Sequence, residues 1–165
     1  MGFFGYMKKI KLTQGKFALV DDEDFEWLNQ WKWYYFPHRK TGYAERRIRI
    51  PGNGRKRKTI RMHRLILDAP DGVLVDHKHG NGLDNRRSEI RLCNRSENGF
   101  NRGKTKQNSS GLKGAYWQKQ INRWYSRITV YKKDIYLGTF DTAEQATEAY
   151  KKAALKYHGE FACVL

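Results

Sequence analysis

The residues best suited to chemistry are the consecutive pair Asp76 and His77, together with Asn85 and Asn98 further along the chain. A neutral imidazole takes a proton from water, and a hard divalent cation stabilises charge on a leaving oxygen. Mg²⁺ keeps several of its waters, so one carboxylate and one amide oxygen are enough to hold it. This set would suit the hydrolysis of a phosphodiester bond with Mg²⁺ or Mn²⁺.

Four consecutive elements must position these residues. Apolar residues 73–75 predict a strand that ends at Asp76 and His77, and residues 90–93 predict a return strand after a loop rich in Gly and Asn. Asn94 and Glu97 fit a capping box at the start of a helix. Asn98 would then lie in the first turn of that helix.

The stretch from residue 62 to residue 101 resembles the HNH endonucleases, specifically the phage and intron-associated homing enzymes. The resemblance is carried by Asp76-His77, by Gly80-Asn81-Gly82-Leu83-Asp84-Asn85-Arg86 and by Glu97-Asn98. It implies that His77 is the general base, that Asp76 and Asn98 hold the cation, and that Asn85 braces the loop and orients the histidine. His79 is a second candidate for the base or for a ligand.

A basic stretch precedes this segment, with eleven Lys or Arg against one acid between residues 39 and 64. Strands are expected over residues 43–50 and 58–62, and the alternation in Arg47-Ile48-Arg49-Ile50 separates a charged face from an apolar face. We interpret this stretch as a basic hairpin on DNA phosphates, and the alternative is a solvated run of charges. The expected contacts are Arg47, Arg49, Arg57, Arg61 and Arg64, and by the resemblance also His63, Arg86 and Arg87.

The first part of the chain predicts a small unit of strands and a helix. Two strands around a Gly turn are expected over residues 8–20, and four acids at residues 21–24 suit the start of a short helix. The aromatic residues between positions 25 and 36 are expected to form the core of this unit. A base-stacking platform is the alternative for them.

The last part of the chain, residues 111–162, resembles an AP2 domain, above all in Tyr-Leu-Gly-Thr-Phe-Asp-Thr-Ala-Glu from residue 136 to residue 144. Strands are predicted at residues 114–118, 124–130 and 134–140, and the spacing of alanines predicts a helix from about residue 142 to residue 158.

In the AP2 family the sheet enters the major groove, and alternation separates a DNA face from a face that packs on the helix. The resemblance puts on the DNA face Lys113, Tyr116, Gln118, Arg127, Thr129 and Tyr136. It puts on the helix face Trp117, Trp124, Ile128, Ile135, Leu137 and Phe140. Plant members carry arginines at several positions where this chain has Tyr116, Gln118 and Thr129, so their base preference is not carried over.

The overall composition points to a polyanionic partner. Thirty-three Lys and Arg against seventeen Asp and Glu give a net charge of +16 in 165 residues, which favours nucleic acid. No apolar run is long enough to span a membrane, and the first residues lack a signal peptide pattern, so an intracellular protein of phage or mobile-element origin, acting in the cytoplasm of a host cell, is expected. Cys93 and Cys163 fit neither a disulfide framework nor a zinc site.

Together these features predict an α+β protein. It would contain a basic region of strands and helix (1–61), a ββα-metal HNH unit (62–101), a basic linker (102–110) and an AP2-like three-stranded antiparallel sheet packed on one helix (111–165). The predicted activity is metal-dependent cutting of double-stranded DNA by a monomer, most simply nicking, with the AP2 module as an anchor. The alternatives are a non-catalytic DNA-binding regulator with a degenerate HNH site and an RNA-binding protein, although no RNP-like or KH-like pattern is present.

Overall fold

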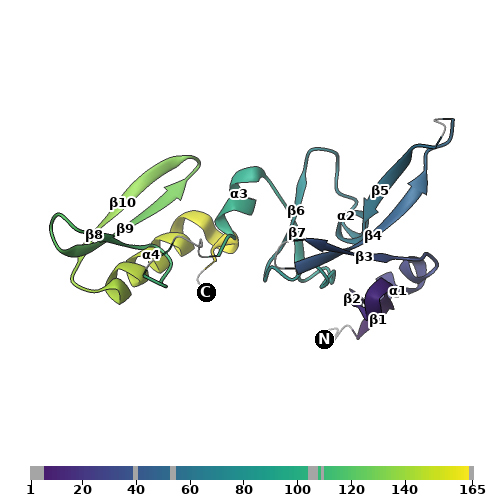
Figure 1. Ribbon diagram of the computed structural model, residues 1–165, viewed down its shortest axis with the longest axis horizontal. Helices are drawn as coiled ribbons and strands as arrows, with labels where there is room; N and C mark the ends of the chain where they lie inside the picture. Colours follow the sequence, from purple (N-terminus) through teal and green to yellow (C-terminus); the bar gives the residue numbers. More distant parts are fainter. Residues whose placement is uncertain (1–5, 39–40, 53–54, 104–107, 109, 164–165) are drawn as a thin grey trace. The chain divides into compact units, whose positions relative to one another are not determined.

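The computed structural model describes residues 6–38, 41–52, 55–103, 108 and 110–163. Parts of the predicted N-terminal segment, hairpin turn and linker, at residues 1–5, 53–54, 104–107 and 109, lie outside the described residues. The chain divides into two compact units, Met1–Cys93 and Asn94–Leu165. Both combine small antiparallel sheets with helices, which confirms the α+β class (Figure 1).

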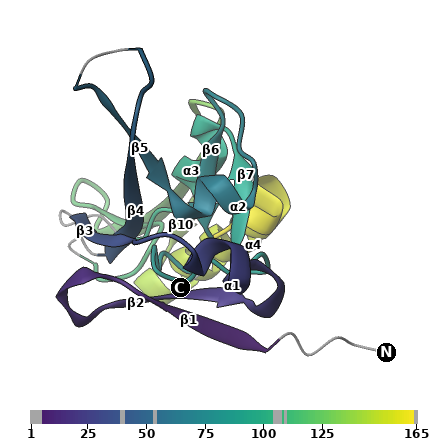
Figure 2. The ribbon, with the colours of Figure 1, turned by 90° about the vertical axis from the view of Figure 1, so that its right-hand side faces the viewer.

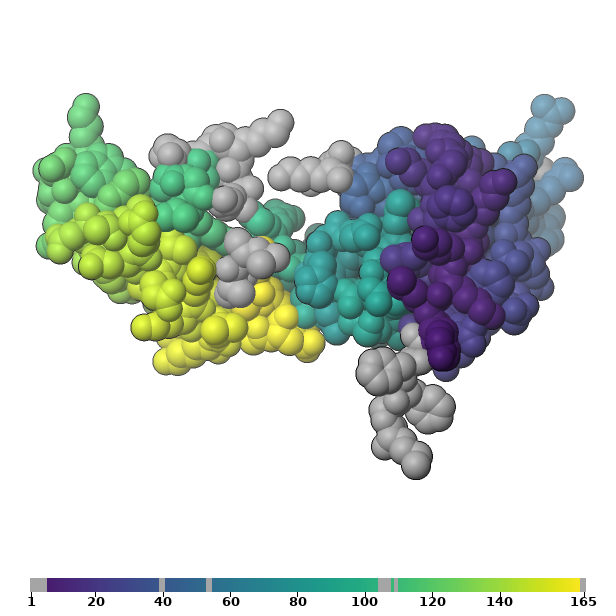
Figure 3. Space-filling view, turned by 90° about the horizontal axis from the view of Figure 1, so that it is seen from below, coloured from purple at the N-terminus to yellow at the C-terminus, as the bar shows by residue number. Residues whose placement is uncertain are grey.

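The first unit begins with a hairpin of β1 (Met7–Lys11) and β2 (Phe17–Asp21), joined by a short 3-10 turn at Thr13–Gly15. Helix α1 (Asp22–Asn29) follows at once, and its first turn carries three acids that favour the positive end of the helix dipole. All three elements were predicted from the sequence. They lie at the surface of this unit and appear in purple in Figure 3.

A second sheet has the order β3-β4-β5, formed by β3 (Tyr34–His38), β4 (Thr41–Arg49) and β5 (Arg57–Arg61). The sequence predicted β4 and β5 but not β3. Pro37 cannot donate a backbone hydrogen bond, and β3 accommodates it because this strand lies at the edge of the sheet. Strands β4 and β5 project from the unit as a two-stranded arm (Figures 1 and 2).

The rest of the first unit carries the predicted catalytic residues. A five-residue helix, α2 (Met62–Ile66), follows β5 directly where the sequence had predicted only the end of a strand. Strands β6 (Leu74–His77) and β7 (Ile90–Cys93) pair antiparallel, as expected. Strand β6 therefore ends on Asp76 and His77.

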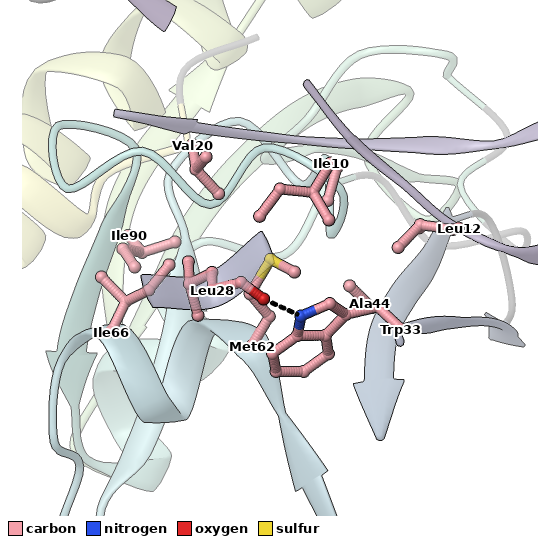
Figure 4. Packing of buried hydrophobic residues seen from close by; sticks show 10 residues of the cluster. Ile10, Leu12, Val20, Leu28, Trp33, Ala44, Met62, Ile66 and Ile90 are labelled. Atoms are coloured by element: carbon pink, nitrogen blue, oxygen red, sulfur yellow. Dashed lines mark hydrogen bonds between the residues drawn. The ribbon is translucent and has the colours of Figure 1, made fainter. Parts of the chain in front are cut away.

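One hydrophobic core joins these elements (Figure 4). Trp33 is 1% exposed, and its Nε1 donates to the carbonyl oxygen of Leu28 at 2.9 Å, which satisfies the one polar group of the indole. Tyr34 and Phe36 remain 45% and 41% exposed, so the expectation that the whole aromatic cluster forms the core was wrong for these two. The core residues are Ile10, Leu12, Ala18, Val20, Leu28, Trp33, Ala44, Met62, Ile66 and Ile90.

The second unit begins with α3 (Arg95–Phe100), and the capping box predicted from the sequence is present. Asn94 Oδ1 accepts hydrogen bonds from the backbone N–H groups of Ser96 and Glu97, both at 2.9 Å. Glu97 Oε2 accepts from the backbone N–H of Asn94 at 2.8 Å. The box satisfies three donors that a helix start would otherwise leave without partners.

A three-stranded antiparallel sheet and a long helix complete this unit: β8 (Ala115–Gln118), β9 (Arg123–Val130), β10 (Lys133–Phe140) and α4 (Ala143–His158). All four were predicted, and α4 covers one face of the sheet (Figure 1). A 3-10 turn at Gly159–Phe161 ends the described fold. In the described part of the chain, no helix is both long and apolar enough to cross a membrane.

Small side chains on α4 let the helix approach the sheet closely. The apolar contacts centre on Ile128, Tyr150, Ala153 and Ala154, with Ala115, Ala143 and Ala146 nearby. Trp117 lies on the predicted helix face, opposite Trp124, but it does not pack fully against α4. It is 43% exposed and meets Trp124 edge to face, with ring centroids 5.1 Å apart.

Candidate functional site

Asp76 and His77 lie at the end of β6 and are both buried, at 6% and 7% exposure. The β6–β7 register puts Asp76 opposite Arg91. Arg91 donates from Nε and Nη2 to Asp76 Oδ2, at 3.1 and 2.9 Å. A buried carboxylate is costly without a counter-charge, so this guanidinium both compensates and orients Asp76.

The loop between β6 and β7 is tied to the first hairpin through its backbone. The N–H of Leu19 donates to the carbonyl oxygen of Leu83, and the N–H of Asn85 donates to the carbonyl oxygen of Leu19, both at 2.8 Å. Asn85 is fully buried, and its Nδ2 donates to the Leu83 carbonyl at 3.2 Å. These bonds leave the Asn85 amide little freedom to turn.

A glycine lets the same loop approach β4. A Cβ atom at Gly82 would collide with the Gly42 carbonyl oxygen and with the ring of Tyr43. The N–H of Gly82 donates to Thr41 Oγ1 at 2.9 Å. The loop is therefore held between β2 on one side and β4 on another.

The environment of His77 favours its neutral form. Burial lowers the pKa of His77 from its ordinary value, while the hydrogen-bonding side chain of Asn85 and the charges of Asp76 and Asp84 raise it to a smaller extent. A neutral imidazole is the form that accepts a proton. His77 therefore has the protonation state that a general base needs near pH 7.

Two aromatic rings pack around His77 within the first unit. The ring of His63, from α2, lies with its centroid 5.0 Å from that of His77. Tyr43, from β4, contacts both histidines at centroid distances of 5.3 and 5.9 Å. His63 is 5% exposed, and burial, followed by the charges of His77, Arg61 and Arg64, lowers its pKa to about 3.

An open pocket of about 350 Å³ lies at the end of β6. His79 is exposed, and its Nδ1 lies 2.6 Å from Glu89 Oε2. This contact joins the two ends of the loop between β6 and β7. Arg86 donates two hydrogen bonds to Asp84, from Nε to Oδ1 at 2.8 Å and from Nη2 to Oδ2 at 2.6 Å. The pocket is lined by His77, His79, Asn81, Asp84, Arg86 and Glu89.

The arm presents one arginine-bearing face. Arg49 lies opposite Arg57 and Arg47 lies opposite Thr59, and residues directly opposite in an antiparallel pair share a face. Arg47, Arg49 and Arg57 are all exposed. At the base of this face Arg61 pairs with Glu45 at 2.9 Å and lies over the ring of Tyr43. The basic face thus leads to Tyr43, which contacts His77.

Other basic residues expected at phosphates have partners inside the first unit. Arg64 donates to the carbonyl oxygens of Ala69, Pro70 and Val73 at 3.0, 2.8 and 2.6 Å. Arg87 donates two hydrogen bonds to Asp24, from Nε to Oδ2 at 2.9 Å and from Nη2 to Oδ1 at 2.8 Å. These contacts and the burial of His63 shape the candidate site, and DNA contact by these residues stays a prediction.

The two expected cation ligands belong to different units, Asp76 to the first and Asn98 to α3 of the second. Their meeting at one cation stays a prediction. Among the residues that the structure describes, no three His, Cys, Asp or Glu side chains gather as a metal site. A carboxylate and an amide oxygen fit a hard cation that keeps most of its waters, and they do not fit the nitrogen and sulfur set of zinc.

The face of the C-terminal sheet opposite α4 carries Tyr116, Gln118, Arg127, Thr129 and Tyr136. Sequence reasoning missed Tyr125, which lies opposite Tyr116 on the same face. The strand alternation contained this signal. Lys113 is different, because its Nζ donates to the carbonyl oxygens of Arg102 and Cys163 at 2.6 and 3.0 Å, and its charge is used within the unit.

The sequence is similar to proteins of two kinds. It is 33% identical to protein 3.8 of Escherichia phage T7 over 110 residues, which cover 64% of this chain and 90% of that protein. It is 29% identical to an uncharacterized HNH endonuclease of Acanthamoeba polyphaga mimivirus over 162 residues, 95% of this chain and 79% of the relative. No family model matches the sequence.

The second kind is plant transcription factors. A stretch of 76 residues, 45% of the chain, is 40% identical to an AP2-like ethylene-responsive transcription factor of Arabidopsis thaliana, and it spans 13% of that protein's length. The mimivirus relative is named as an HNH endonuclease, and the plant relatives are named as AP2-like transcription factors. Both resemblances expected from the sequence thus have counterparts among distant homologues.

Proposed function

The chain belongs to the same family as protein 3.8 of Escherichia phage T7, and we propose that it is a metal-dependent endonuclease that nicks double-stranded DNA. His77 carries the proposal: a buried imidazole with a lowered pKa stands beside Asp76 at the end of β6 and lines an open pocket. Similarity to a mimivirus HNH endonuclease over nearly the whole chain supports it. The phage and viral relatives fit action inside a host cell.

In the proposed reaction His77 takes the proton of the attacking water. Its lowered pKa keeps the ring neutral before the step. Asn85 orients the ring, and its own amide is fixed by the bond to the Leu83 carbonyl. Tyr43 and His63 pack against His77 and restrict its side-chain rotation.

Asp76 and Asn98, the ligands that the HNH resemblance implies, would hold Mg²⁺ or Mn²⁺. The bound cation would neutralise charge on the scissile phosphate and on the leaving oxygen. Arg91 holds the Asp76 carboxylate in a fixed orientation through Oδ2.

The substrate would be held by two surfaces. The exposed arginines of the arm, Arg47, Arg49 and Arg57, would contact phosphates of the strand that reaches His77. The AP2-like sheet would anchor the enzyme at a second place along the duplex, which raises the effective concentration of the cutting site. A monomer with one such site cuts one strand.

Relaxation of supercoiled plasmid tests the proposal. The parent chain, His77→Ala and His79→Ala are compared with Mg²⁺, with Mn²⁺ and with EDTA, at equal DNA occupancy by gel shift. Loss of a general base should slow nicking about 10²- to 10⁴-fold in His77→Ala. His79→Ala should keep most of the activity, because His79 is exposed and held by Glu89.

Two outcomes would count against the proposal. Equal loss of activity in the two variants would show that the effect is not specific to His77. A parent chain that binds plasmid tightly but does not cut it with either cation would favour a non-catalytic DNA-binding regulator.

A further inference from the structure

The face of the C-terminal sheet that points away from α4 carries a stack of three tyrosine rings, Tyr116, Tyr125 and Tyr136, here called the tyrosine ladder. The ring of Tyr125 lies 5.3 Å from that of Tyr116 and 6.5 Å from that of Tyr136, with planes tilted by 27° and 26°. Tyr116 is 38% exposed and Tyr136 is 61% exposed. This is a large aromatic surface on a rigid support.

The strand register fixes the ladder. Tyr116 lies directly opposite Tyr125, and Tyr136 lies opposite Arg127, just before an irregularity in β10 that brings Gly138 opposite Ser126. Tyr136 is diagonal to Tyr125 and is also hydrogen-bonded to Thr139 through its hydroxyl. Rings held in this way lose little further freedom when they contact a partner.

Both arginines on this face already have carboxylate partners. Arg127 Nη1 is 3.0 Å from Asp134 Oδ2, and Arg123 Nη2 is 2.6 Å from Asp141 Oδ1. The guanidinium of Arg127 also lies over the ring of Tyr116. Guanine is read in the major groove chiefly by arginine forks on O6 and N7. Using either arginine in this way would first break its ion pair.

The groups that remain for base contact suit A·T pairs. The thymine C5-methyl lies in the major groove and is recognised by apolar contact, which tyrosine rings supply. Gln118, on the same face at the end of β8, has the amide that reads adenine through N6 and N7. The chemistry of this face is therefore opposite to that of an arginine-rich, guanine-reading face.

The stacking also argues for duplex over single-stranded DNA as the occupant. Binding of unpaired bases uses exposed aromatic faces on which the bases stack. In the ladder the faces of Tyr125 are turned toward its two neighbours, which leaves little room on them for an unpaired base to stack. The net charge of +16 favours a long polyanion such as a duplex.

We propose that the tyrosine ladder, with Gln118, makes the second unit prefer A·T-rich duplex DNA by contacting thymine methyl groups in the major groove. This inference rests on the proposed function, because it assumes that the sheet binds DNA. It adds the base composition of the sequence that the enzyme prefers.

The test uses the full chain in EDTA, so that bound DNA is not cut. Duplexes selected from a randomised library should be rich in A·T pairs. Replacing dT by dU in a selected duplex removes only the methyl groups, and affinity measured by fluorescence anisotropy should fall about fourfold for each methyl that is contacted.

Variants connect the methyl effect to the ladder. We expect lower affinity for the dT duplex in Tyr136→Ala and in Tyr116→Ala, and these variants should no longer distinguish the dT duplex from the dU duplex. Tyr136→Phe should keep both the affinity and the difference between the two duplexes. Tyr157→Ala is the matched control, because Tyr157 is 37% exposed on α4, away from the strands of the ladder. Circular dichroism checks that each variant is folded.

Equal affinity for the dT and dU duplexes, selection of G·C-rich sequences, or tighter binding to single strands would each overturn the inference. The nicking assay does not depend on base preference, so each of these results would leave the proposed nuclease function standing. Failure of the parent chain to bind any duplex would instead contradict the proposed function itself.

Discussion

His63 from α2 and His77 from β6 meet edge to face, with ring centroids 5.0 Å apart and ring planes at 83°. Both side chains are buried, and burial is the largest cause that lowers the pKa of each. The charge of either ring would also oppose protonation of the other. This contact is therefore stable in the neutral form and ties the folding of the first unit to pH.

We expect acid to destabilise the first unit through His63. Its pKa is about 3 in the folded chain and 6.5 in the ordinary state, so between these values the unfolded chain binds more protons and acid favours unfolding. Lowering the pH from 7 to 5 should remove about 2 kcal/mol from the free energy of unfolding through His63 alone. Urea titrations at pH 7 and at pH 5 measure this loss, and hydrogen exchange of the β6 amides shows whether the first unit is the part affected.

His63→Phe keeps a ring beside His77 without a titratable group, so the variant should lose about 2 kcal/mol of this pH dependence. His38→Gln serves as the control, because His38 is exposed. An unchanged pH dependence in His63→Phe would show that His63 does not carry the effect.

Asn85→Ala should slow nicking about 10- to 100-fold with little change in DNA affinity, as expected when a side chain that orients a reactive histidine is lost. Loss of the buried bond to Leu83 should also cost about 1–3 kcal/mol of stability. Single-turnover nicking and urea titration separate the two effects. Asn29→Ala changes an exposed asparagine of α1, outside the candidate site, and should stay close to the parent.

The arm should contribute to DNA affinity from one face only. Arg49→Gln should lower the slope of log affinity against log salt by about 0.9, the value of one lost phosphate contact. Lys58→Gln removes an equal charge from the opposite face of the same hairpin and should leave the slope nearly unchanged. Equal slopes in both variants would mean that the charge acts without regard to face.

Phe100 should fix α3 to the second unit, because its ring stacks on the buried ring of His158 at 3.8 Å with planes 5° apart. Phe100→Ala should cost about 3–5 kcal/mol of stability in this unit and speed hydrogen exchange in α3. Nicking should also fall, because α3 carries Asn98. Phe100→Leu retains apolar volume and should show smaller changes, whereas normal exchange in Phe100→Ala would exclude this role.

Local features of the sequence predicted most elements correctly. The capping box at Asn94 depends only on residues three positions apart, and the strands that end in the candidate site follow from short apolar runs. The structure contains two elements that were missed. Strand β3 holds Pro37 and lacks alternation, and α2 has only five residues, too few to show a helical period.

The candidate site shows the same division between local and tertiary information. The order of Asp76, His77 and Asn85 and the termini of their strands could be read from the sequence, because each depends on its immediate neighbours. The sequence could not show which basic side chains remain available for DNA. Arg64, Arg87 and Lys113 cannot be told apart by residue type from the other basic residues, but each meets acceptors that lie close only in the folded chain.

The sequence by itself therefore determined most of the helices and strands, the residues capable of chemistry and the attraction to a polyanion. Only the tertiary structure decided that His63 is buried against His77, that the arginines of the arm share one face, and that three tyrosines form a ladder. The physical reason is that burial and pairing arise from contacts between segments distant in sequence. Charge and residue type are fixed before the chain folds, while the environment of each side chain is fixed only by folding.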